Sequence, residues 1–235
     1  MNETPGKLLA ADEPAPVTVR NESCPSPFLI VADHAGNFVP RALGRLGLPE
    51  AELERHIAWD IGIAAVGRLL ADRLDATLVQ QNYSRLVIDC NRVPESETSI
   101  PEISELTPVP GNIGLSEWQK AARAHEIFWP YQDRIESEFE RRRLSGRPVV
   151  PIAMHSFTPV FKGVLRPWLL AHRCRQGAIH PISWRRRHRV LPGRCLTLGQ
   201  GELDGARRRL PQQVPMPNLV RGRLPCVGDT IGSSL

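Results

Sequence analysis

Two apolar runs that each end in a histidine constrain the fold of this chain more than any other feature of its sequence. Residues 27–33 form a short, continuous apolar run, which is typical of a strand covered on both faces, and His34 follows directly. Residues 147–155, RPVVPIAMH, predict a second strand that ends at His155. Segments with helical spacing lie between the two. We therefore expect a three-layer α/β fold, with helices on both faces of a mainly parallel or mixed sheet.

The segments that follow the first run predict one long helix, two strands and a loop. Apolar residues recur with helical spacing from Leu48 to about Asp75. ATLVQQ and RLVIDC, residues 76–81 and 85–90, are strand candidates. Residues 93–114 are rich in proline and acidic residues, so they predict a long loop, and such loops are often functional.

A capping box marks the start of a second helix. Ser116 is followed three residues later by Gln119, the pair that satisfies the first free backbone amides of a helix. The apolar face of this helix is expected to contain Trp118, Ala121, His125, Phe128, Ile135 and Phe139.

Composition indicates a soluble protein of the cytoplasm. No apolar run approaches the roughly 20 residues that a membrane-spanning helix needs. The first 20 residues lack the basic start and apolar core of a secretory signal. The five cysteines are odd in number and lack a disulfide-framework spacing, which favours a reducing compartment.

The charge of the chain is unevenly distributed. Residues 169–235 contain 12 arginines, no lysine and three acidic residues, although the net charge of the whole chain is only +5. We therefore predict an irregular N-terminal segment at 1–21, a globular domain at 22–168 and an Arg-rich tail at 169–235. Because hydrophobic periodicity is lost in the tail, this part of the fold is expected to be incomplete or disordered. One hypothesis is that the tail is an out-of-frame reading of a GC-rich gene.

The two histidines that follow strands are candidate metal ligands. In α/β sheets, ligands bind beyond the carboxyl ends of the strands, where His34 and His155 are both expected. Two imidazoles need one carboxylate to complete a catalytic zinc site. Asp60, four residues after His56 on the predicted helix, is one candidate, and Asp33 could instead orient His34. The alternative is that each histidine is an ordinary hydrogen-bonded structural residue.

Two arginines could bind an acidic substrate. Arg85 and Arg92 stand at the two ends of one strand candidate, close to Asp89 and Asn91. A guanidinium group donates two parallel hydrogen bonds to a carboxylate, so this pair would suit a substrate with acidic groups. A structural ion pair between Arg85 and Asp89 is the alternative.

Nucleophilic and nucleotide-binding mechanisms find little support in the sequence. Cys90 is expected to be buried in a strand, and Ser156 lacks the G-x-S-x-G elbow that would expose it. The chain contains no Walker A loop, GxGxxG or CxxC pair.

Several spaced motifs in this chain resemble those of the N-formylglutamate amidohydrolase family. They occur in order across residues 22–168 and read DHAGNFVP, HIAWDIG, NYSRLVIDCNR with the acidic loop after it, FWPYQ, MHSFTP and GVLRPW. The resemblance implies a zinc-carboxypeptidase-like fold and a bound divalent metal, with Zn²⁺ favoured. It also implies hydrolysis of the amide in N-formylglutamate or a related N-acyl amino acid, a small-molecule reaction of amino acid metabolism.

The resemblance also implies roles for individual residues. The expected metal ligands are His34, Asp60 and His155. The expected substrate-binding residues are Arg85, Arg92 and Asn37. The family continues with a Glu-containing strand that resembles a source of the general base, and nothing in residues 169–235 matches it, so the catalytic base stays unassigned.

Two other functions fit parts of the sequence. WRRRHR and ARRRL in the tail could form a basic arm for nucleic acid. The tail lacks interleaved aromatic residues and the body is mildly acidic, so we disfavour this function. A hydrolase scaffold that has lost its activity could instead bind the same small molecule without turning it over.

Overall fold

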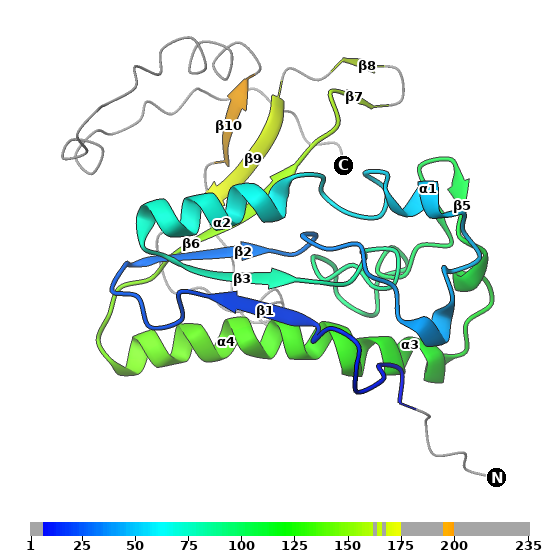
Figure 1. The fold of residues 1–235 in the computed structure, drawn as a ribbon, viewed down its shortest axis with the longest axis horizontal. Helices are drawn as coiled ribbons and strands as arrows, with labels where there is room; N and C mark the ends of the chain where they lie inside the picture. The colour runs from blue at the N-terminus through cyan, green and yellow to red at the C-terminus, as the bar shows by residue number, and fades with distance from the viewer. Residues whose placement is uncertain (1–6, 162–163, 166–167, 175–194, 200–235) are drawn as a thin grey trace.

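The computed structural model describes residues 7–161, 164–165, 168–174 and 195–199, and its centre is a mixed sheet (Figure 1). Within this part of the chain, the sheet has six strands in the order β1-β3-β2-β6-β9-β10. Their bounds are β1 Val17–Arg20, β2 Phe28–Ala32, β3 Thr77–Gln81, β6 Val150–Ser156, β9 Trp168–Cys174 and β10 Cys195–Gly199.

The central strands are parallel and the outer strands are antiparallel. β2 lies between β3 and β6 and runs parallel to both, whereas β1, β9 and β10 pair antiparallel with their neighbours. Leu29, Ile30 and Ala32 of β2 are fully buried, as expected of a strand that is covered on both faces. The strands predicted at 27–33, 76–81 and 147–155 are thus confirmed, as is the mixed α/β class.

Helices cover both faces of the sheet, as Figure 1 shows. On one face, α2 (Ile63–Leu74) packs on β2, β3 and β6. On the other lie α3 (Glu117–Arg123), a π-helical turn, η3 (Ala124–Phe128), and α4 (Trp129–Leu144). The fully buried Arg142 of α4 pairs with Glu138 and donates to backbone oxygens near β2, which fixes this helix against the strand ends.

The predicted helix from residue 48 to 75 is wrong in its middle. The chain forms a short α1 (Glu50–Leu53), then irregular turns, and then α2. Gly62 has a φ of +80°, a left-handed conformation that precedes α2 and that glycine adopts without strain. His56 and Asp60 therefore do not share a helical face.

The strand predicted at residues 85–90 is also wrong. This segment forms consecutive turns, and its backbone bonds to distant loops, with Arg85 N–H donating to Ala58 O and Asp89 N–H to Ser99 O. Leu86, Val87 and Ile88 are all buried in the larger apolar core. Burial on all sides, rather than pairing in a sheet, accounts for the continuous apolar run.

The loop predicted at residues 93–114 is confirmed as a mostly irregular segment with small ordered pieces. A two-residue hairpin turn joins β4 (Ile103–Ser104) to β5 (Thr107–Pro108), and a 3-10 turn, η2, follows at Pro110–Asn112. The other short elements are η1 (Arg41–Leu43), β7 (Val160–Phe161) and β8 (Val164–Leu165). β1 lies inside the N-terminal segment that was expected to be irregular.

The capping box is confirmed, but the expected apolar face is only half right. Ser116 Oγ accepts from Gln119 N–H at 3.3 Å, and Gln119 Oε1 accepts from Ser116 N–H at 2.9 Å. Phe128 and Ile135 are buried, whereas Trp118, Ala121 and His125 are exposed. The π-helical turn inserts extra residues between the two halves, so one face of α3 does not continue into the same face of α4.

The predicted tail is only partly described. Residues 168–174 and 195–199 form strands β9 and β10, and both lie mainly in the segment that was expected to be incomplete or disordered. The rest of the tail, with its arginine clusters, lies outside the described residues. Among the residues that are described, no helix is both long and apolar enough to cross a membrane.

Candidate functional site

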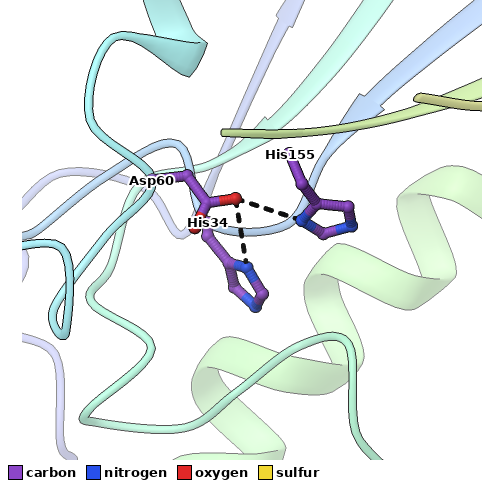
Figure 2. A group of neighbouring side chains, drawn as sticks. All are labelled: His34, Asp60 and His155. Carbon is purple, nitrogen blue, oxygen red and sulfur yellow. Dashed lines mark hydrogen bonds and ion pairs between the residues drawn. The ribbon is translucent and has the colours of Figure 1, made fainter. Parts of the chain in front are cut away.

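His34, Asp60 and His155 meet at one edge of the sheet (Figure 2). His34 follows β2 by two residues, and His155 is the penultimate residue of β6. Because β2 and β6 are parallel neighbours, their carboxyl ends bring the two rings together. Asp60 joins them from the turn before α2, where its backbone N–H donates to His34 O at 2.9 Å.

The carboxylate of Asp60 lies between the two imidazole rings. Its Oδ2 atom is 3.1 Å from His155 Nδ1 and 3.6 Å from His34 Nδ1, as the dashed lines in Figure 2 mark. The ring centroids are 5.2 Å apart. One ligand atom from each of the three residues lies within 4.8 Å of the others, so a single cation could contact all three.

The two nitrogens of His34 have different surroundings. Nε2 lies 2.7 Å from Asp89 Oδ1, and because a carboxylate only accepts, Nε2 carries the proton. In the neutral ring, Nδ1 then has a lone pair, and at 3.6 Å from Asp60 this atom is beyond hydrogen-bond length. Although His34 is only 2% exposed, Nδ1 has no hydrogen-bond partner among the described residues.

Charges around the site shift the pKa values of its members. Burial and the charge of Arg85 lower the pKa of His34, but the carboxylates of Asp89 and Asp60 outweigh them and raise it to about 9. Burial alone would raise the pKa of Asp60, yet the adjacent His155 and His34 hold it well below its usual range. The pKa of Asp89 is lowered in the same way, against burial, by His34 and Arg85.

This donor set fits a divalent cation. Two imidazoles and one carboxylate are the protein ligands of many catalytic zinc sites, which leave a fourth position open. A buried ring nitrogen without a partner is costly unless something binds it. The carboxylate behind Nε2 of His34 is the outer partner that metal-bound histidines commonly have. The three residues could therefore hold a metal.

Asp89, and not Asp33, is the carboxylate that contacts the ring of His34. Asp33 accepts from Tyr131 Oη at 2.7 Å and lies 3.8 Å from His155 Nε2, so it faces His155 and not His34. Asp89 orients His34 instead. His34 and Asp89 are 55 residues apart in the chain, so no local sequence signal could have paired them.

A cavity of about 720 Å³ opens next to the three residues. Arg85 and Arg92, the arginines that we expected to bind substrate, both line it. Arg85 also bonds Asp89 at 2.8 Å, so the ion pair considered as its alternative role is present. Asn37 is not among the lining residues, because its amide donates to Leu53 O at 3.2 Å and to Glu54.

Two residues that sequence reasoning passed over also line the cavity. His56 Nε2 lies 2.8 Å from Glu105 Oε1, and the two come from the turns before α2 and from the β4–β5 hairpin. The HIAWDIG motif contains His56, but only Asp60 was selected from it. Neither candidate nucleophile is suited to attack. Burial raises the pKa of the Cys90 thiol well above its usual value, and Ser156 Oγ donates to Ile61 O.

The sequence matches a known family over most of the region that builds this site. The family model described as N-formylglutamate amidohydrolase matches residues 26–181, which is more than half of the chain. The chain belongs to the N-formylglutamate amidohydrolase family. All three candidate metal ligands and both cavity arginines lie inside the N-formylglutamate amidohydrolase match.

This N-formylglutamate amidohydrolase family member is also similar to a solved structure. It is the crystal structure of the gene product Atu2144 from Agrobacterium tumefaciens, with 41% sequence identity and a TM-score of 0.67. The match covers 68% of this chain and 64% of that chain, so it spans less than two thirds of the other protein. No protein with a curated description matches significantly.

Proposed function

We propose that this protein is a metal-dependent hydrolase that cleaves the amide of N-formylglutamate or a related N-acyl amino acid. Membership of the N-formylglutamate amidohydrolase family supports the reaction class. The observation that carries the proposal is the buried, unpartnered Nδ1 of His34, which faces Asp60 and His155 beside a cavity lined by two arginines. A zinc-carboxypeptidase-like arrangement is part of this proposal.

His34, Asp60 and His155 would hold the cation, and Zn²⁺ suits their nitrogen and oxygen donors best. When bound, such an ion would polarise the acyl carbonyl and acidify a water molecule. Asp89 keeps the proton of the neutral His34 ring on Nε2, so that Nδ1 is the nitrogen that would bind the cation once its own proton has left. The site therefore keeps its ligands in place before any cation arrives.

The arginines would bind the carboxylates of the substrate. Arg92 is exposed and makes no side-chain ion pair with another described residue, so its guanidinium is free for a ligand. Arg85 already shares its charge with Asp89, and its Nη1 is 3.6 Å from Asp60. We therefore assign the stronger substrate contact to Arg92, and to Arg85 a role that links substrate and metal site.

The test combines metal content with product release. Purified protein is stripped with a chelator, reloaded with Zn²⁺, and assayed for formate released from N-formylglutamate. We expect about one zinc per chain, and we expect His155→Ala to lose both the metal and about 10²-fold or more of the activity. His125→Ala, which removes an exposed histidine on the π-helical turn, is the matched control and should change neither.

Two results would count against the proposal. If the wild-type protein binds no divalent metal, the assignment of the three ligands fails. If it binds metal and is thermally stabilised by N-formylglutamate but releases no formate, the protein is a binding protein on a hydrolase scaffold. The disfavoured nucleic-acid function stays untested, since the arginine clusters lie outside the described residues. A cytoplasmic location stays a prediction.

A further inference from the structure

Amide hydrolysis needs a group that accepts a proton from water and returns one to the leaving amine. The described lining of the cavity contains two carboxylates, Asp60 and Glu105. Asp60 is committed, because it bonds His155 and the backbone N–H of Ser156. Of the described groups that line the cavity and could carry a proton, the pair of His56 and Glu105 is the one outside the metal cluster.

We infer that His56 is the acid–base residue of this site and that Glu105 is the residue that positions it. The inference rests on the amidohydrolase function proposed above. It assigns a proton-transfer role to a histidine in the turn before α2, and it does not need a general base from the tail.

The hydrogen bond to Glu105 fixes the tautomer of His56. Nε2 of His56 lies 2.8 Å from Glu105 Oε1, and since the carboxylate only accepts, the neutral ring carries its proton on Nε2. The lone pair is then on Nδ1, which has no hydrogen-bond partner among the described residues. A neutral ring with an open Nδ1 is ready to accept a proton, and the carboxylate stabilises the imidazolium that forms.

The exposure of the pair suits a proton carrier. The His56 side chain is 32% exposed and that of Glu105 is 22% exposed, whereas His34 is almost fully buried. Both of these side chains line the cavity that also contains the metal-ligand candidates. A group in this position can exchange protons with bulk water between turnovers, whereas a fully buried ion pair cannot.

The backbone conformation of Glu105 favours glycine, so the presence of a side chain there suggests that its carboxylate has a function. Glu105 is the first residue of the two-residue turn between β4 and β5 and has a φ of +56°. In such hairpin turns this position favours glycine, because a side chain strains the left-handed conformation. Arg55, which also bonds Thr107 of the hairpin at 3.0 Å, lies 3.8 Å from Glu105 Oε2. The strained residue is thus held with its carboxylate on His56.

The proton balance of the reaction closes with His56 alone. A water molecule gives one proton to Nδ1 of His56 as its oxygen bonds to the acyl carbon. The carbon–nitrogen bond then breaks, the nitrogen keeps the electron pair, and the imidazolium returns the proton to that nitrogen. The acid that forms ionises, and the free amine takes up this last proton at neutral pH. One water is consumed, and a carboxylate and an ammonium group are produced.

The experiment uses the full-length, zinc-loaded protein and N-formylglutamate. His56→Ala should lower kcat by about 10²–10⁴-fold and remove one limb of the pH profile of kcat. Zinc content and the affinity for the product glutamate should stay at the wild-type level. Added imidazole should restore at least about tenfold of the lost rate, because it can occupy the vacated space and carry the proton.

Two further variants separate catalysis from folding. Glu105→Gln keeps the shape and the hydrogen-bond acceptor but removes the charge, so kcat should fall by about 10–100-fold with KM nearly unchanged. Glu52→Gln is the matched control, since Glu52 bonds Arg55 and Thr107 of the same hairpin without lining the cavity. Its kcat should match that of the wild type.

Each outcome has a distinct meaning. An inactive wild-type protein contradicts the proposed function itself. An active wild type whose His56→Ala variant keeps its kcat overturns this inference and leaves the proposed function intact. If His56→Ala loses activity together with its zinc, the pair of His56 and Glu105 is structural and the inference is overturned. The same holds if imidazole does not rescue His56→Ala and Glu52→Gln is equally impaired.

Discussion

The two nitrogens of the His34 ring would give the proposed metal binding a defined pH dependence. Without a metal, the pKa of His34 is raised to about 9, so its Nδ1 carries a proton at neutral pH. A cation must displace that proton. We expect the apparent affinity for Zn²⁺ to rise by about tenfold per pH unit up to pH 9 and then to level off. Competition with a chelating dye between pH 6 and pH 9.5 measures this slope, and a flat profile would show that no proton leaves.

The carboxylate behind His34 should matter almost as much as the ligands. Asp89→Asn leaves the three ligand side chains in place but removes the charge that fixes the ring at 2.7 Å. We predict a loss of about 10–100-fold in zinc affinity, as found for outer partners of metal-bound histidines. Asp72→Asn is the control, because Asp72 is an exposed carboxylate paired with Arg20. Equal affinities for the two variants would remove Asp89 from the site.

At the residue scale, the sequence predicted which candidate residues meet better than it predicted their hydrogen-bond partners. The meeting of His34 and His155 could be predicted, because each lies at the end of an apolar strand and the strands are parallel neighbours. Asp60 was selected for a helical face that does not exist, and the structure places it beside His34 through a backbone hydrogen bond. Asp89 and Glu105 could not be assigned, since their partners are 55 and 49 residues away in the chain.

At the scale of elements, the turn after β2 depends on a glycine. A Cβ atom on Gly36 would lie 1.9 Å from Asn82 O, a backbone atom that cannot move without shifting β3. We predict that Gly36→Ala lowers the free energy of unfolding by about 1–3 kcal/mol and weakens metal binding, because His34 lies two residues away. Urea unfolding and zinc titration test this prediction.

A second glycine supplies the control for this substitution. Gly67 lies within α2, where a Cβ would meet Leu78 Cδ1 at an ordinary 3.4 Å. Gly67→Ala should therefore be neutral or slightly stabilising, since alanine favours a helix more than glycine does. If both substitutions behave alike, the close approach at Gly36 is not what limits the turn.

Elements were predictable where one environment covers a whole segment. No residue of β2 or β6 is exposed, so their apolar runs identify them. The run at residues 86–88 looks the same, because buried turns and buried strands both select apolar side chains. The helical spacing from residue 48 to 75 crosses a break at Gly62 because both halves pack inward, residues 48–58 on the larger apolar core and α2 on a second, smaller apolar cluster. The spacing of apolar residues indicates which segments are buried. Only the backbone hydrogen bonds show whether a buried segment is a strand, a helix or a turn.

For the molecule as a whole, β9 protects the sheet. It pairs antiparallel with β6 from Ile152 to Ser156, next to the metal-ligand candidate His155. A chain that ends at residue 167 would leave this edge of β6 unpaired, and unpaired edges promote aggregation. We predict that it is less soluble, melts at a lower temperature and binds zinc more weakly than a chain that ends at residue 199. The test is to express both chains and to compare their soluble yield, melting temperature and zinc affinity.

The division of the chain and the origin of its tail stay predictions. The N-terminal boundary at residue 22 places β1 outside the predicted domain, although β1 pairs with β3 in the same sheet. Resequencing the gene tests whether the arginine-rich residues are out of frame, and a verified continuous reading frame would end that hypothesis.

The pairing of β2 with β6 also sets when this protein can acquire its ion. The first of the proposed ligands is made early in translation, and the last follows 121 positions later, so a nascent chain has no complete set until most of it has left the ribosome. The proposed site would therefore be complete only after these two strands have docked. A chain without the proposed cation would be a folded precursor whose ligands are already in place.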